Sequence, residues 1–150
     1  MNQLKKNLSN ITESTTNNRN LLSYVHNKAN AKLGDSLVNF LYSIAKSLVS
    51  GSPTGIKVSD SILSESYKCS QWFKTKTLTL SGNKGQIADS IEALVLYFWI
   101  QESMTIEELI KPIVSNLHAD NLHHPKEERK SAIQAFQKFL DYLFDFYSKK

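Results

Sequence analysis

Apolar residues recur along most of the chain at spacings of three and four, the period of an amphipathic helix. The segment 86–101 is apolar almost all round, so we expect it to form a buried central helix. Alternation typical of a strand is confined to 75–80, which we interpret as an extended connection. The other strong helical patterns cover residues 33–49, 59–73, 104–117 and 126–147. The sequence therefore predicts an all-α fold, a single-domain helical bundle.

The N-terminal segment 1–19 is polar and weakly patterned, so we expect a short helix or partial disorder there, followed by one helical domain over 20–150. The segment has no hydrophobic stretch of the signal-peptide type. No apolar run in the chain approaches the roughly 18 residues of a membrane span. We therefore expect a cytoplasmic protein that does not enter a membrane. The single cysteine, Cys69, excludes an internal disulfide and a cysteine-based zinc cluster.

Charge is distributed unevenly along the chain. Residues 1–84 contain 11 Lys or Arg against 4 Asp or Glu, which gives a net charge of +7. Residues 85–150 contain 7 against 10, which gives −3. A basic half of this kind favours a polyanionic partner such as a nucleic acid.

Three carboxylates occupy unusual positions in this pattern. Asp35 follows Gly34 in the first turn of the predicted helix 33–49, and Asp89 and Glu92 lie three residues apart in the most apolar helix. Residues at that spacing project from one helix face, so both can point at the same spot. Charges beside buried surface are costly unless a cation compensates them, and oxygen ligands suit Mg²⁺ or Mn²⁺. The alternative is that these acids are helix caps or complement helix dipoles.

Two motifs in order resemble the ribonuclease III family. Leu33–Val38 (LGDSLV) resembles the signature Glu-x-Leu-Gly-Asp-Ala-Val/Leu, and Lys84–Leu94 contains a match to Leu-Ala-Asp-x-x-Glu-Ala-Leu. Between them, Lys57–Lys68 is similar to the middle helix of the family. The resemblance covers about residues 20–117 and implies the helical fold of the ribonuclease III endonuclease domain.

Carried over by position, the resemblance implies that Asp35, Asp89 and Glu92 are catalytic and bind Mg²⁺, with Mn²⁺ as the alternative. The reaction it implies is metal-dependent hydrolysis of phosphodiester bonds in double-stranded or structured RNA. Two positions depart from the family pattern. Ala31 stands where the family has a Glu, and Lys28 stands at another acidic position, so one metal ligand is missing.

The resemblance also bears on partners. It implies a homodimer whose two sites face one RNA duplex, with ribosomal RNA processing as one use and general duplex cleavage as another. After the second motif the sequence offers no αβββα module for double-stranded RNA, so we expect the compact form of the Mini-III and archaeal members. The lysines that we expect to contact the RNA backbone are Lys57, Lys74, Lys76 and Lys84.

Two other functions stay open at this stage. A non-catalytic protein of the same fold would bind structured RNA without cutting it, as Ala31 suggests. A helical protein-interaction module would carry the acids only as caps, and would bind neither magnesium nor RNA.

Overall fold

The computed structural model describes residues 2–14 and 20–150 of the chain. In this part of the chain there are eight α-helices, one short 3-10 helix and no strand, so the predicted all-α fold is confirmed. None of the described helices is both long enough and apolar enough to span a bilayer. The helices are α1 (Gln3–Ser14), α2 (Leu21–Val25), α3 (Lys28–Ser50), α4 (Asp60–Cys69), α5 (Gln71–Lys74), α6 (Lys84–Ile100), α7 (Ile106–Ser115), η1 (Ala119–Asn121) and α8 (Pro125–Ser148).

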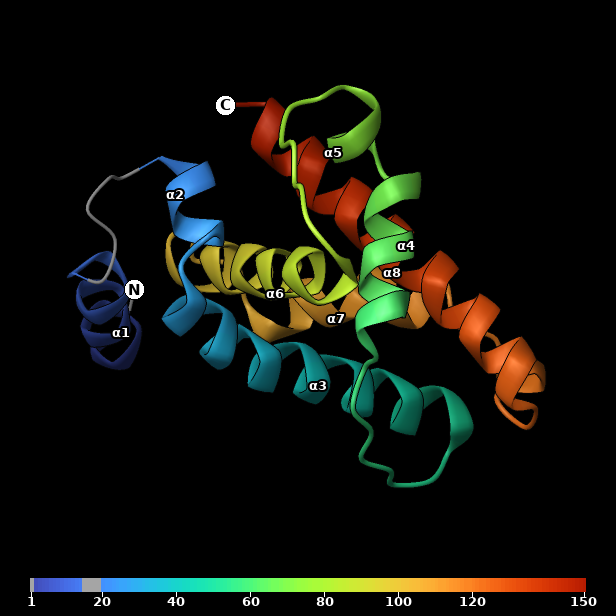
Figure 1. The fold of residues 1–150 in the computed structure, drawn as a ribbon. Coiled ribbons are helices and arrows are strands. Elements are labelled where there is room, and N and C mark those ends of the chain that lie inside the picture. The colour runs from blue at the N-terminus through green and yellow to red at the C-terminus, as the bar shows by residue number, and fades with distance from the viewer. Residues whose placement is uncertain (1, 15–19) are drawn as a thin grey trace.

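The apolar helix α6 lies at the centre of the molecule, as the sequence predicts. It packs against α2, α3 and α4, and Figure 1 shows it running through the middle of the molecule beside α3. Its first turn is closed by a capping box, in which Asn83 and Gln86 each bond to the other's backbone N–H. Side chains all round the helix, from Ile87 to Ile100, are buried. Glu92, which is among these buried residues, therefore stands next to the core.

Helix α3 begins five residues earlier than the sequence pattern predicts. Asn27 caps it, accepting a hydrogen bond from the backbone N–H of Asn30 at 3.0 Å. The first turns are mostly polar, which hides the helical period, yet Asn30 and Ala31 are buried. Asp35 consequently lies in the third turn, so its interpretation as a helix cap is wrong.

The predicted helix 59–73 is in fact two helices. The backbone of Ser70 is extended (φ −86°, ψ 164°), which ends α4 and starts the short helix α5. Helix α8 fixes this break, because Asp141 accepts a hydrogen bond from the Gln71 N–H at 2.8 Å and the Trp72 indole donates to the Leu140 carbonyl at 2.8 Å. Trp72 is fully buried.

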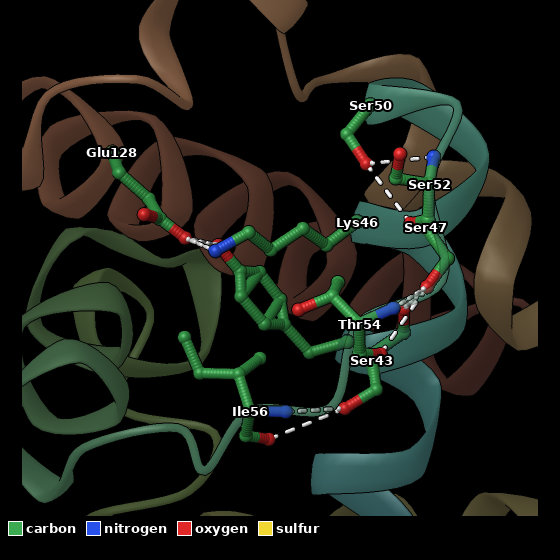
Figure 2. Close-up of polar contacts among 9 residues, drawn as sticks. Ser43, Lys46, Ser47, Ser50, Ser52, Thr54, Ile56 and Glu128 are labelled. Atoms are coloured by element: carbon green, nitrogen blue, oxygen red, sulfur yellow. Dashed lines mark hydrogen bonds and ion pairs between the residues drawn. The ribbon is translucent and has the colours of Figure 1, made fainter.

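Serine side chains on α3 hold the connection to α4 against the helix (Figure 2). The Ser43 hydroxyl accepts from the Ile56 N–H at 2.9 Å and donates to the Ile56 carbonyl at 3.3 Å. One turn later, the Ser47 hydroxyl accepts from the Thr54 N–H at 2.9 Å. These bonds satisfy the backbone N–H groups of alternate residues in an extended segment, which runs antiparallel to α3. The path of the chain towards α4 is therefore fixed by polar side chains of α3.

Candidate active site

The site begins at a close approach of two helix backbones. A Cβ atom at Gly34 of α3 would lie 2.1 Å from the carbonyl oxygen of Glu92 in α6, a distance that no side chain tolerates. Only glycine permits this contact between the helices. It places Asp35, the next residue of α3, beside Glu92.

Asp35 and Glu92 form a hydrogen-bonded carboxyl pair. Glu92 is only 4 % exposed, and this burial, together with its bond to Asp35, raises its pKa to about 9. The hydrogen bond from Glu92 lowers the pKa of Asp35. Asp35 also accepts a bond from the Asn39 amide at 3.1 Å. At neutral pH the pair therefore holds one proton, with Glu92 as the donor and Asp35 as the charged acceptor.

Two further carboxylates line the same cavity, whose volume is about 320 Å³. Asp89 lies one turn before Glu92 on α6 and is exposed, and Asp60 is the first residue of α4. Both lie near enough to Glu92 to add to the rise in its pKa. The three carboxylates singled out in the sequence thus meet in one cavity, contributed by two helices, and a third helix adds Asp60.

The donor set fits a hard divalent cation. Carboxylate oxygens are the ligands that Mg²⁺ and Mn²⁺ prefer, and a nearly buried carboxyl such as Glu92 needs either a proton or a cation to compensate its charge. Within the described residues, no three His, Cys, Asp or Glu side chains are already arranged to hold a metal ion. An ion would have to displace the proton of the Asp35–Glu92 pair.

The comparison with protein families agrees with this geometry. The model described as Ribonuclease III matches residues 28–147, which is most of the chain. The chain belongs to the ribonuclease III family. No curated protein matches it. The matched range begins at the first residue of α3 and includes all four carboxylates of the cavity and the whole of α7. Membership supports a ribonuclease-type function.

Sequence reasoning missed Asp60 as a residue of this ribonuclease III site. Ser59 caps α4, since its hydroxyl accepts from the Ile62 N–H at 3.3 Å. The Asp60 carboxylate is therefore left to face the cavity. Only the path of the connection between α3 and α4 reveals this, and the sequence gives no direct signal of that path.

Asn39 was also missed, although its spacing offered a signal. It lies four residues after Asp35, one turn along the same face of α3. Its side chain donates to Asp35 and accepts from the Val58 N–H at 2.8 Å. Asn39 thus extends the row of polar contacts that the α3 serines make with this connection. The contact with Val58 places the neighbouring Lys57 at the cavity, where the charge of Lys57 further lowers the pKa of Asp35.

The four lysines expected to contact RNA do not form one cluster. Lys57 lines the carboxylate cavity. Lys84 is the first residue of α6, and its charge helps to lower the pKa of Glu65 on α4. Lys74 is the last residue of α5, at the end of α4 away from α3 (Figure 1), and Lys76 lines a different hollow. Only Lys57 therefore stands beside the carboxylates.

Proposed function

We propose that this ribonuclease III family member is a metal-dependent endoribonuclease that hydrolyses phosphodiester bonds in double-stranded or structured RNA. The observation that carries the proposal is the Asp35–Glu92 carboxyl pair, held by the helix contact at Gly34 in a cavity that Asp89 and Asp60 also line. Helix caps would not require such a contact, and neither would a protein-interaction module. We place the protein in the cytoplasm as part of the same proposal.

Each carboxylate has a defined task in this reaction. Asp35, Asp89 and Glu92 would hold Mg²⁺ or Mn²⁺, which when bound acidifies a water molecule and draws charge from the scissile phosphate. Glu92 must first release the proton that it shares with Asp35. Asn39 keeps Asp35 in position by its hydrogen bond. Asp60, across the cavity, would orient the attacking water.

Lysines would hold the RNA backbone, because duplex RNA is recognised mainly through its phosphates and its shallow minor groove. Lys57 would bind next to the cleavage point and Lys84 at the start of α6. Lys74 and Lys76 would meet the backbone at a second point, nearer to α5.

A second candidate function is RNA binding without cleavage. It is favoured by the composition of the cavity, which three lysines line together with the four carboxyl groups. Three ammonium groups in one cavity would attract RNA. They would also compete with a metal ion for the carboxylates.

The decisive experiment incubates the protein with a long labelled RNA duplex and Mg²⁺ or Mn²⁺, beside Asp35→Asn and Glu92→Gln. We expect metal-dependent cutting that falls by at least about 100-fold in both variants, since each removes a charged ligand. Glu127→Gln, an exposed carboxyl on α8, is the matched control and should cut normally. Salt-sensitive RNA binding without cutting would favour the second candidate. If the protein neither cuts nor binds the duplex, both candidates are contradicted.

A further inference from the structure

The carboxylate cavity contains its own cations. Besides Lys57, it is lined by Lys28 and Lys32, both from the first two turns of α3. Lys28, Lys32 and Asp35 lie on one face of the helix, because their spacings are those of successive turns. Three ammonium groups therefore stand among four carboxyl groups.

The charges of the cavity set a limit on the metal it can accept. With all four carboxyl groups ionised, the three lysines leave the cavity with a formal charge of −1. One divalent ion changes this charge to +1, which suits a phosphate. A second divalent ion would face three ammonium groups at close range, and like charges repel strongly where solvent is partly excluded. The arrangement therefore favours one ion.

Lys28 differs from the other two lysines in its surroundings. It also lines a neighbouring polar cavity of about 260 Å³. The two cavities share Lys28, Ala31 and Asp89, so they adjoin at these three residues. The short, buried side chain of Ala31 leaves room between them. The second cavity is lined further by polar side chains, among them His26, Asn27, Ser81, Gln86 and Ser90.

Lys28 is also available to bind an anion. The ion pairs found among the described residues, Lys46–Glu128, Arg129–Glu65 and Lys150–Glu102, do not include it. Its side chain is exposed, as are those of Lys32 and Lys57. The charge of Lys57 acts on Asp35, and Lys32 lines only the carboxylate cavity, whereas Lys28 lines both cavities. A lysine with these properties between two connected polar cavities is suited to an RNA phosphate next to the one being cleaved.

We infer that the Lys28 ammonium group binds an RNA backbone phosphate adjacent to the scissile one, in the place of a second divalent ion, so that each site takes a single metal ion. This inference rests on the RNA substrate proposed above. It makes Lys28 a substrate-binding residue, and the adjoining cavity the place of the neighbouring nucleotide.

Two measurements that need no turnover test the inference. Manganese alone is titrated into the protein and counted by electron paramagnetic resonance, and we expect one ion per chain. Binding of a labelled RNA duplex is then measured in EDTA over a range of salt concentrations. Lys28→Met should weaken binding by about threefold to tenfold and reduce the slope of log affinity against log salt by about one. Lys28→Arg should retain the wild-type slope.

Lys138→Met is the matched control, since Lys138 is an exposed lysine of α8 that lines neither cavity. Two manganese ions per chain, or none, would overturn the inference, as would equal binding by Lys28→Met and Lys138→Met. One ion with Lys28-dependent RNA binding but no cutting would contradict the proposed nuclease, while the single ion and the contact between Lys28 and an RNA phosphate would stand.

Discussion

A single proton in the Asp35–Glu92 pair decides the electrostatics of the site. Folding moves the Glu92 carboxyl from water into a nearly buried position beside Asp35, and its pKa rises from 4.5 to about 9. The folded protein therefore keeps a proton that the unfolded chain releases above about pH 4.5. Stability then depends on pH with a sign opposite to that of an ordinary paired carboxylate.

We predict that Glu92→Gln stabilises the metal-free protein at pH 8 while it abolishes cleavage. Between pH 4.5 and about 9, the folded wild-type protein binds one more proton at this position than the unfolded chain, so its stability falls as pH rises. Glutamine carries no such proton, and its amide can donate to Asp35. We expect a gain of at least about 1 kcal/mol, or roughly 2–4 °C in Tm.

The measurement is thermal unfolding in EDTA at several pH values from 5 to 9. The difference between the two proteins should widen towards pH 9, and Glu127→Gln should follow the wild-type curve. The lowered pKa of Asp35 acts in the opposite direction, but only at pH values below its ordinary 3.8, outside this range. Parallel curves for wild type and Glu92→Gln would contradict the shared proton.

At the scale of single residues, the sequence predicted the centre of the site better than its edge. Asp89 and Glu92 could be found because a helical spacing of three puts two acids on one face. Asp35 could be found because it follows a glycine in a recognisable motif. Asp60 could not, since its position depends on side-chain bonds from α3 to a connection with no regular structure.

At the scale of elements, the crossing of α3 and α6 determines whether the carboxyl pair exists. The two backbones touch at Gly34, where the Glu92 carbonyl occupies the place of a side chain. The sequence predicted both helices but not the start of α3, because the polar residues of its first turns interrupt the apolar period. Burial of Asn30 and Ala31 there becomes visible only once α3 is packed.

We predict that Gly34→Ala destabilises the protein by about 1–3 kcal/mol, because the new methyl group forces the two helix backbones apart. The higher helix propensity of alanine, about 1 kcal/mol, offsets only part of this cost. Separation of Asp35 from Glu92 should also reduce cleavage strongly.

Urea unfolding and the duplex-cutting assay together measure both effects. Gly55→Ala is the control, since a Cβ atom there meets no atom within 4 Å and both its stability and its activity should stay normal. A stable Gly34→Ala variant with full activity would show that the close crossing is not required.

At the scale of the whole molecule, α3 has two functional faces. The carboxylate and lysine side chains lie on one, and exposed apolar residues lie on the other, with Phe40 50 % and Leu48 65 % exposed. Together with Ile106 and Ile110 of α7, they line an apolar groove of about 450 Å³. A contiguous apolar surface of this kind marks an interface. Since the groove lies on the side of α3 opposite Asp35, a second copy could cover it without closing the active site.

We predict that this groove is the contact of the homodimer, and that Phe40→Glu converts the protein to a monomer. A charge in the middle of an apolar interface should weaken association by at least about 2 kcal/mol, or roughly thirtyfold.

Light scattering should give about twice 17.0 kDa for the wild type and 17.0 kDa for the variant. Tyr142→Glu alters an exposed aromatic residue of α8 and should remain dimeric. A dimeric Phe40→Glu would contradict this interface, and a monomeric wild type would contradict the dimer itself. Because Phe40 points away from the carboxylates, loss of the dimer should leave manganese binding intact, which separates assembly from the chemistry of the site.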